Sequence, residues 1–445
     1  MSYERLLELI ENKEYFTLKK ELEDLNEADI AEYVDELDTK DTLLVFRLLS
    51  KEKAALVFAE FSKATQNEIA TGITEGELAT VIEDLYFDDM IDALEDLPSN
   101  LVKSLITKAT PEKRKMINQF LGYLEDSAGS IMTIEFVKLR KQMTVKEALA
   151  HIKEIGLDRE TVYTNYITDS SNHLEGIISL RKLVISDDDE ILEDIMDTDV
   201  IFVHTDEDQE EVASTFKKYG FLALPVVDSE NRLTGIITVD DIIEIIQEEN
   251  TEDFERMAAI SPTDDEYLDL SPFGHAIKRL PWLMILMVSA TVTGNIILNF
   301  EDALSKMTIL TSFIPMLMDT GGNSGSQSST LIIRGLALGE IEFKDFFKVV
   351  WMEFRTAIVV AILLSLVNYA RLLIFTSVNP TVALVVSFSL IITVVSAKLI
   401  GSTLPLIAVK LKLDPAIMAG PLITTIVDST SLLGYFWLAT NLLNL

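Results

Sequence analysis

The sequence predicts a multidomain membrane protein with four parts in order: an α-helical superhelical N domain, a tandem α/β module, a long connecting helix and a five-helix transmembrane domain. Two observations predict this organisation. The chain holds 72 acidic and 37 basic residues, yet the segment from Leu280 onward holds nine of each, so the whole net charge of −35 lies before it. After the same point the chain becomes a series of long apolar runs, which are typical of membrane spans.

The acidic part of the chain argues against nucleic acid as a ligand, because a body of this charge repels phosphate and also itself unless cations or basic partners screen it. A solvated surface is the simpler interpretation of the charge alone. The chain contains no cysteine, which excludes disulfides, thiolate zinc sites and thiol catalysis. Its first residues, MSYERLLELIENKEYF, are acidic and amphipathic, so we expect no secretory signal and a cytosolic N-terminus.

Residues 1–130 are predicted to form an acidic, regulatory N domain of short amphipathic helices. The segments ADIAEYVDELD, KAALVFAEFS and DDMIDALEDLP each place apolar residues at i, i+3, i+4 and i+7, which is the helical period. EYVDELD also resembles DALEDLP, which indicates a helical repeat whose neighbours bury one another's apolar faces.

A second repeat fills residues 131–190 and 191–248. Met132-Thr133 begins one copy and Met196-Asp197 the other, and Gly176-Ile-Ile-Ser179 corresponds to Gly235-Ile-Ile-Thr238. Each copy runs helix, two short β-branched strands joined by a turn, then helix. This order resembles a tandem pair of CBS domains, which are regulatory modules that commonly bind adenine nucleotides such as ATP.

The resemblance implies a nucleotide site in the second copy, where Thr238 and Asp241 match the Ser/Thr-x-x-Asp pattern that reads a ribose. The first copy has Ser179 but carries Lys182 where the acid is expected. A CBS pair that serves only as a dimer scaffold is the alternative.

Residues 240–279 are predicted to form a long acidic connecting helix and a short linker, able to transmit a movement to the membrane. The transmembrane domain, 280–445, holds five segments with the roughly 20 residues that a span needs, at about 282–300, 308–336, 349–375, 381–409 and 416–440. Basic residues cluster in alternate loops. The positive-inside tendency therefore predicts a multi-pass protein of the plasma (inner) membrane, with the N-terminus cytosolic and the C-terminus outside.

Two carboxylates, Asp319 and Asp428, lie inside predicted spans. An acid there costs roughly 2.5–3.5 kcal/mol and so faces a water-filled path or a partner. Thr424 and Thr425 lie one turn before Asp428, with hydroxyls and carbonyls that face a similar way. Alternatively, Asp428 pairs with a base such as Lys398.

Asp319 opens the run DTGGNSGSQSS, whose small residues let helices approach closely or let backbone carbonyls reach an ion. Capping of the glycine loop, or a hydrogen bond to it, is the simpler role for this acid. Pro315, Pro405 and Pro421 are expected to free further carbonyls as ligands. These groups are all hard oxygen donors, which favours Mg²⁺, Ca²⁺ or Mn²⁺. One acid per subunit, doubled by a twofold axis, would suit hydrated Mg²⁺.

Three segments and the CBS pair together resemble the MgtE family of magnesium channels over essentially the full chain: YLEDSAGSIMT (123–133), DTGGNSGSQSSTLIIRGLALGEI (319–341) and LDPAIMAGPLITTIVDSTSLLGYF (413–436). The resemblance implies a homodimer in a lipid bilayer, with its pore on the twofold axis between the second and fifth spans. It implies entry of Mg²⁺ into the cytosol down its electrochemical gradient. The implied pore residues are Asp428, Asn323, Thr424, Thr425 and Gly420. Ser326 stands where the family usually repeats an asparagine.

The resemblance also implies regulation, in which cytosolic Mg²⁺ binds between acidic surfaces of the N domain, CBS pair and connecting helix and closes the pore. The predicted regulatory ligands are Asp88, Asp92, Asp208, Glu210, Asp241, Glu244, Glu249, Glu252, Asp253 and Asp414. Gly220 stands where the family can carry a further acid. Several weak sites together can supply the roughly 5.5 kcal/mol that shifts an equilibrium from 1:99 to 99:1.

Other functions remain open at this point. The membrane part could carry another divalent cation (Co²⁺, Ni²⁺ or Ca²⁺) or an anion, and the sequence does not separate a channel from a coupled transporter. Asp319-Thr-Gly superficially matches an aspartic-protease triplet with Asp428 as its partner, although such chemistry needs two carboxylates that share a proton. We expect no enzymatic activity.

Overall fold

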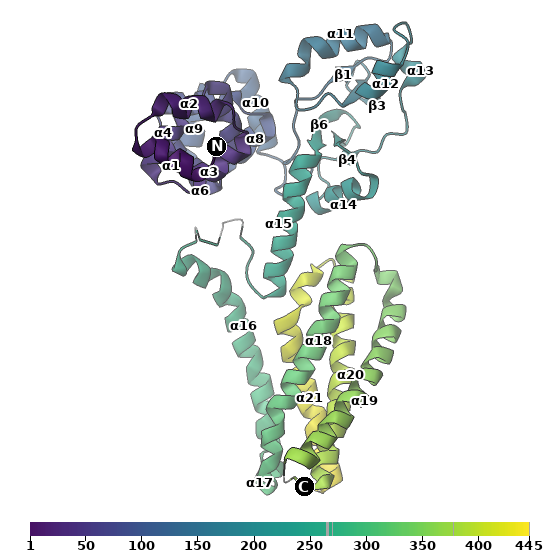
Figure 1. Cartoon of the computed structure of the whole chain (residues 1–445). Helices are drawn as coiled ribbons and strands as arrows, with labels where there is room; N and C mark the ends of the chain where they lie inside the picture. Colours follow the sequence, from purple (N-terminus) through teal and green to yellow (C-terminus); the bar gives the residue numbers. More distant parts are fainter. Residues whose placement is uncertain (264–266, 269, 377, 445) are drawn as a thin grey trace. The chain divides into compact units, whose positions relative to one another are not determined.

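The computed structural model describes residues 1–263, 267–268, 270–376 and 378–444 (Figure 1). The chain divides into an N-terminal unit, Met1–Gln247, and a C-terminal unit, Glu248–Leu445. The division falls within one helix, α15 (Val239–Met257), so the predicted connecting helix contributes residues to both units.

The first part of the N-terminal unit consists of short helices, as predicted (Figure 1). They are α1 (Tyr3–Glu11), α2 (Tyr15–Glu23), α3 (Glu27–Asp35), α4 (Thr39–Phe46), α5 (Lys51–Ala59), α6 (Lys63–Gly72), α7 (Glu75–Asp84), α8 (Phe87–Asp96), α9 (Ser99–Lys108) and α10 (Pro111–Phe120). Side-chain caps define many of their starts; Thr74 and Glu77, for example, form a capping box at α7. Each helix buries one apolar stripe in a shared core, because helices this short are not stable alone.

The CBS-type repeat has the predicted order of elements in both copies. The first copy contains β1 (Lys138–Leu139), α11 (Val145–Ile155), η1 (Gly156–Asp158), β2 (Thr164–Thr168), β3 (Leu174–Ser179), α12 (Leu180–Ile185) and α13 (Leu192–Ile195). The second contains β4 (Val203–His204), α14 (Gln209–Tyr219), β5 (Ala223–Val227), β6 (Leu233–Thr238) and then α15. In each three-stranded sheet the first pair of strands is parallel and the second is an antiparallel hairpin.

The two copies exchange their first segments. Thr133, which begins copy one, pairs with Ile236 of β6 in copy two through N–H···O bonds of 2.8 and 2.9 Å. Asp197, which begins copy two, pairs in the same way with Ile177 of β3. A Cβ at Gly235 would lie 2.6 Å from Met132 Sδ, and one at Gly176 would lie 2.9 Å from Met196 Sδ. The repeated Met and Gly-Ile-Ile motifs therefore mark one interface between the copies.

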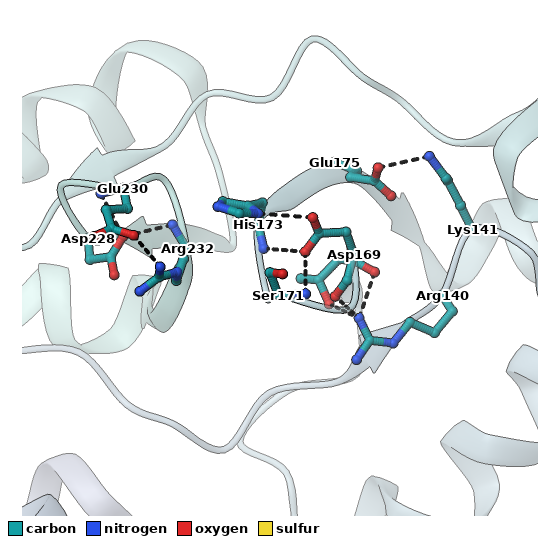
Figure 2. Close-up of polar contacts among 10 residues, drawn as sticks. Arg140, Lys141, Asp169, Ser171, His173, Glu175, Asp228, Glu230 and Arg232 are labelled. Carbon is teal, nitrogen blue, oxygen red and sulfur yellow. Dashed lines mark hydrogen bonds and ion pairs between the residues drawn. The ribbon is translucent and has the colours of Figure 1, made fainter.

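The two hairpin turns also match and lie side by side (Figure 2). Asp169 Oδ1 accepts hydrogen bonds from the backbone N–H groups of Ser171 and His173 at 2.7 and 2.9 Å. Asp228 Oδ1 accepts equivalent bonds from Glu230 and Arg232 at 2.9 and 2.8 Å. A short aspartate accepts readily from backbone two residues on, which explains why the turn residues repeat.

The linker after α15 is shorter than predicted. The next helix, α16 (Pro272–Asn299), begins ten residues before the expected span at 282. Ser271 caps it by accepting from Gly274 N at 3.1 Å, and Pro272 occupies its first turn, where a missing N–H costs nothing. Residues 264–266 and 269 of the predicted linker lie outside the described residues.

The C-terminal unit continues with α17 (Glu301–Lys306), η2 (Thr308–Phe313), α18 (Ile314–Ala337), η3 (Phe343–Asp345), α19 (Phe346–Phe375), α20 (Pro380–Lys410), η4 (Pro415–Met418) and α21 (Gly420–Leu443). The five predicted spans correspond to α16, α18, α19, α20 and α21 (Figure 1). Within the described residues, four of these, all except α18, are both long and apolar enough to cross a membrane. At about 1.5 Å per residue α18 is also long enough, but the polar run from Asp319 lowers its hydropathy.

The glycine-rich run is a helix, so the expectation of a glycine loop or of free carbonyls there is wrong. Pro315 and Pro421 lie in the first turns of α18 and α21, where a proline releases no carbonyl, and Pro405 alone is internal, in α20. The other predicted role of the small residues, close approach of helices, is confirmed, because a Cβ at Gly401 of α20 would overlap the backbone of Gly325 in α18. This contact joins α18 to α20, and a Cβ at Gly325 would also lie 2.7 Å from Ile423 Cγ2 of α21.

Candidate functional site

Asp428 has one carboxylate oxygen that is buried and makes no hydrogen bond to any residue that the structure describes. Thr424 and Thr425 do not serve it, because their hydroxyls donate to Gly420 O at 2.7 Å and Pro421 O at 3.1 Å. Those hydroxyl oxygens keep lone pairs, so they remain potential ligands. A buried carboxylate oxygen is costly to leave without a partner, and this one is therefore the strongest candidate for contact with a cation or its water.

The face of α18 that carries Asn323 is exposed and polar. Asn323 Nδ2 donates to Asp319 Oδ1 at 3.2 Å, so Asp319 hydrogen-bonds within the glycine-rich run, as its simpler role predicted, although this run is a helix and not a loop. The stripe continues along the same face of the helix through the adjacent Ser326 and Gln327, then Thr330 and Arg334; all of its members are exposed except Ser326, which is partly buried. We call Asp319, Asn323, Ser326, Gln327, Thr330 and Arg334 the polar stripe.

The polar stripe lies beside the threonines of α21. Gly322, the neighbour of Asn323, touches Thr424, since a Cβ at Gly322 would lie 2.8 Å from Thr424 Cγ2. A Cβ at Gly321 would lie 2.9 Å from Val427, next to Asp428. The structure therefore brings together the two segments predicted to line a pore. Gly420 is the first residue of α21, and a Cβ there would lie 3.6 Å from the backbone oxygen of Met257.

The alternative pairing of Asp428 with Lys398 is wrong. Lys398 Nζ donates instead to Ser328 Oγ of α18 at 3.2 Å, and Lys398 is only 6 % exposed.

In the N-terminal unit, carboxylates of α8 face those at the start of α15. The pKa of Asp88 is raised well above its usual value, and the pKa of Asp89 and Asp92 is raised to about 7. Burial is the largest cause of each of these pKa shifts. The negative charge of Asp241 adds to each of these shifts. Glu160, which follows η1, belongs to the same group, because burial and then Asp241 raise its pKa to about 7.

The sequence predicted only part of this acidic cluster. Asp88, Asp92 and Asp241 were expected, and Glu244 contributes to the raised pKa of Asp89. Asp89 and Glu160 were missed, although Asp89 directly follows a predicted ligand. Asp208 instead caps α14, where its Oδ1 accepts from the backbone N–H of Glu210 at 2.9 Å.

A second acidic group lies in the C-terminal unit, where the end of α15 meets the segment before α21. Arg256 forms ion pairs with Glu252 and with Asp414. Burial, then the charges of Asp414 and Glu249, raise the pKa of Asp253 to about 6. Met257 packs here against Ile333, Ala416 and Ala419. Sequence reasoning missed Arg256, although it is the only base in α15.

Neither acidic group forms a ready metal site. Within the described ranges no three His, Asp or Glu side chains have an arrangement that could hold a metal ion directly. Asp88 Oδ1 is nevertheless buried without a hydrogen-bond partner in the described part of the chain. Like charges held close together, with oxygens still unsatisfied, offer sites for a cation that keeps its water.

Thr238 and Asp241 lie next to each other as the nucleotide pattern requires. Thr238 Oγ1 donates to Asp241 Oδ2 at 2.6 Å at the start of α15. The first copy holds a group that the sequence did not predict. Burial lowers the pKa of Lys138, and the charges of Arg140 and Arg159 lower it further, so three cations lie close together. Two more groups, Arg159 Nε and the Tyr166 hydroxyl, are buried with no partner among the described residues.

A bundle of long apolar helices carries a polar stripe and a carboxylate oxygen without a partner among the described residues, and it is joined to a CBS-type module. These features define a membrane transport protein with attached soluble domains. Three family models match: "MgtE: Divalent cation transporter" at 314–438, "MgtE intracellular N domain" at 25–126 and "CBS domain" at 128–187 and 192–248. The chain is 35 % identical over 441 residues to "Magnesium transporter MgtE" of Thermus thermophilus, covering 98 % of both chains. It is 33 % identical to the Bacillus subtilis protein of the same name, covering 98 % of this chain and 96 % of that one. The chain therefore belongs to the MgtE family of magnesium transporters.

A solved structure, "the cytosolic domain of the Mg2+ channel MgtE in complex with ATP", covers 55 % of this chain and all of its own, with 35 % identity and a TM-score of 0.53. The resemblance stated from the motifs is thus confirmed, as are the helical N domain and the CBS pair.

Proposed function

We propose that this protein conducts Mg²⁺ into the cytosol down its electrochemical gradient, through a path lined by α18 and α21. The single observation that supports this most strongly is the buried oxygen of Asp428, which has no partner among the described residues and lies on α21, whose Thr424 contacts Gly322 of α18. A carboxylate and asparagine inside apolar helices are costly unless they face water or an ion. Mg²⁺ sheds water reluctantly and is often bound through one or two carboxylates and retained waters. Asp428, Asn323, Thr424, Thr425 and the backbone at Gly420 would bind the hydrated ion.

The polar stripe also supports a homodimer. Except at Ser326 it is exposed on the single chain, in a unit that exposes many large apolar side chains on α16 and α19. Lipid would leave its amide and carboxylate groups unsatisfied. A second copy placed against the same stripe would enclose a water-filled path on a twofold axis and would supply two Asp428 carboxylates.

The experiment that tests the proposal is ion entry into proteoliposomes that contain an indicator dye, with protein-free vesicles as the control. Entry of Mg²⁺ supports the proposal, and its absence with folded, inserted protein rejects it. Parallel measurements with Ca²⁺, Co²⁺ and Ni²⁺ determine which ions the path admits. We expect little entry of Co²⁺ and Ni²⁺, because hard oxygen donors disfavour them, whereas the same donors separate Mg²⁺ from Ca²⁺ only weakly. Cleavage of a membrane peptide without ion entry would instead support the protease alternative.

Regulation by cytosolic Mg²⁺ is the second part of the proposal. After burial, the charge of Asp241 contributes to the raised pKa of Asp88, Asp89 and Asp92, which supports repulsion between the carboxylates of α8 and α15. Hydrated Mg²⁺ would bind between the carboxylates of the two helices and relieve this repulsion, which favours the arrangement in which α8 lies close to α15. The proposed ligands are Asp88, Asp89 and Asp92 on α8 and Asp241 and Glu244 on α15. The ligands proposed for the C-terminal group are Glu249, Glu252, Asp253 and Asp414, and Asp208 and Glu210 are proposed from the second CBS copy. The test is entry rate against internal Mg²⁺: the rate should fall as internal Mg²⁺ rises, and a constant rate would reject this part.

Nucleotide binding by the CBS pair is a further candidate function. The related cytosolic domain in complex with ATP is its first support. The second is the group of Lys138, Arg140 and Arg159, because clustered cations favour a phosphate. The Tyr166 hydroxyl, on the strand paired with Lys138, is buried and has no partner in the described part of the chain. Titration of the full protein with ATP should show binding that Lys138→Ala weakens. Equal affinity in Lys138→Ala and loss in Thr238→Ala would instead favour the Thr238–Asp241 site.

The proposed orientation places the N-terminus in the cytosol and the C-terminus outside. Because the chain has no cysteine, single cysteines report position without background. A cysteine at Asn444 should react with an impermeant thiol reagent added to intact cells, and one at Ser2 should not. The reverse pattern would overturn the orientation.

A further inference from the structure

A buried lysine joins three helices of the C-terminal unit. Lys398 of α20 donates from Nζ to Ser328 Oγ of α18 at 3.2 Å. Ser328, which is 1 % exposed, donates from Oγ to Glu353 Oε2 of α19 at 2.6 Å. The serine hydroxyl thus accepts from an ammonium group and donates to a carboxylate. We call Lys398, Ser328 and Glu353 the lysine triad.

The lysine triad lies on the side of α18 opposite to the polar stripe. Ser328 is on the buried face of the helix, whereas Asn323 is on the exposed face. Gly325, about one turn before Ser328, meets Gly401 of α20 backbone to backbone. Glycine surfaces are smooth and allow neighbouring helices to approach closely, but they resist rotation of a helix poorly. The Lys398–Ser328 hydrogen bond is directional, so it fixes the rotation of α18 and with it the direction of the polar stripe.

The charges of the triad matter as much as its geometry. A single ammonium group buried among apolar helices is costly, and it would repel a divalent cation in the neighbouring path because charges interact strongly at low dielectric. Glu353 supplies the opposite charge through Ser328. An apolar trio of similar volume would hold the helices at least as well. The presence of a charged pair linked by Ser328 is therefore better explained by a need to fix one rotation of α18.

We propose that Lys398 is a positioning residue for the ion path, that Ser328 is its contact on α18, and that Glu353 is the counter-charge that keeps the path permissive to cations. This inference rests on the proposed function, since it assigns the triad a role in conduction along α18 and α21.

The test compares wild type, Glu353→Gln, Lys398→Met and the double variant Glu353→Gln/Lys398→Met in the Mg²⁺-entry assay. Glu353→Gln leaves the lysine charge uncompensated and should lower the initial rate about tenfold. The double variant removes both charges but also the Lys398–Ser328 hydrogen bond, so it should recover only to within about threefold of wild type and should match Lys398→Met, a coupling that only interacting residues show. Glu342→Gln is the matched control, because Glu342 is exposed and pairs with Lys344 outside the helix bundle.

The unfolding midpoint Tm of each variant separates positioning from simple stability. The inference is wrong if Glu353→Gln conducts like wild type, or if the double variant conducts no better than Glu353→Gln. It is also wrong if Tm falls while the rate per folded protein is unchanged, since the triad would then only stabilise the bundle. If wild type itself admits no Mg²⁺, the proposed function fails first and this inference fails with it. Wild-type conduction with an unaffected Glu353→Gln rejects the inference alone.

Discussion

Arg256 and Asp414, 158 residues apart in the chain, form an ion pair that joins the last turn of α15 to the segment before α21. The same arginine pairs with Glu252, and the neighbouring Met257 packs against Ala416 and Ala419. Within the C-terminal unit, the end of the connecting helix is thus attached beside Gly420, where the proposed ion path begins.

Replacement of Arg256 should loosen this attachment. The pair is partly buried, so its loss is expected to cost about 1 kcal/mol, which is about a fivefold change in local opening. We predict that Arg256→Gln increases amide hydrogen exchange in the last turn of α15 by about fivefold without Mg²⁺. Without Arg256, the carboxylates of Glu252, Asp253 and Asp414 lack a positive charge between them. Mg²⁺ should restore protection from exchange, because it would bind these carboxylates in place of the arginine.

The control for that measurement is Arg232→Gln, which removes an exposed pair in a hairpin turn (Figure 2). Exchange at the end of α15 that is unchanged in Arg256→Gln would contradict the attachment. Loosening that Mg²⁺ does not reverse would contradict a cation site among these carboxylates.

The α8–α15 carboxylates predict that the N-terminal unit loses stability as the pH rises. Asp89, Asp92 and Glu160 have a pKa of about 7 in the folded chain, against about 4 unfolded. The folded state therefore binds more protons than the unfolded state between about pH 4 and 7, and its stability falls across that range. Without divalent cations, Tm should fall by at least about 3 °C between pH 5.5 and 7.5.

Mg²⁺ should flatten this pH dependence, because it replaces protons as the counter-charge. Asp89→Asn should flatten it as well, since one repelling charge is gone. Thermal unfolding of the full chain in detergent checks both predictions. A Tm that rises with pH over the same range would show that burial does not hold these acids in their protonated form.

Close packing of Gly401 against Gly325 should make Gly401→Ala destabilising. The added methyl group would overlap the Gly325 backbone, and overpacking of this kind typically costs about 1–3 kcal/mol. Gly294→Ala is the matched control in α16, because a Cβ there meets nothing within 4 Å. Thermal unfolding in detergent should show a lower Tm for Gly401→Ala only. Equal Tm values would mean that α18 and α20 lie further apart than the structure has them.

Local patterns predicted the elements, whereas packing decided the details that were missed. Apolar spacing predicted the helices of the N-terminal unit, and the repeated Gly-Ile-Ile motif predicted the paired hairpins. The small residues of the run from Asp319 predicted either close approach of helices or a glycine loop with carbonyls free to reach an ion. In the structure it is helical, since Gly321, Gly322 and Gly325 let α20 and α21 approach and their contacts outweigh propensity.

A candidate site residue could be proposed from the sequence where it lies inside a distinctive local motif. Asn323 lies in the glycine-rich run of α18, and Asp428 lies in the run that forms α21. Asp89, Glu160 and Arg256 were missed because their neighbours come from distant parts of the chain. Periodicity within one helix contains no information about which other helix faces it. For the same reason Lys398 was considered as a partner of Asp428, whereas it contacts Ser328.

The most direct test of the central claim is Mg²⁺ entry through Asp428→Asn, which removes the charge of the carboxylate and almost preserves its shape. Asp302→Asn, at an exposed acid of α17, is the control. If Asp428 binds the hydrated ion, Asp428→Asn should lose at least about 90 % of wild-type entry, equivalent to about 1.4 kcal/mol or more, and Asp302→Asn should keep it. Wild-type entry through a folded, inserted Asp428→Asn protein would place the ion path elsewhere and contradict the account.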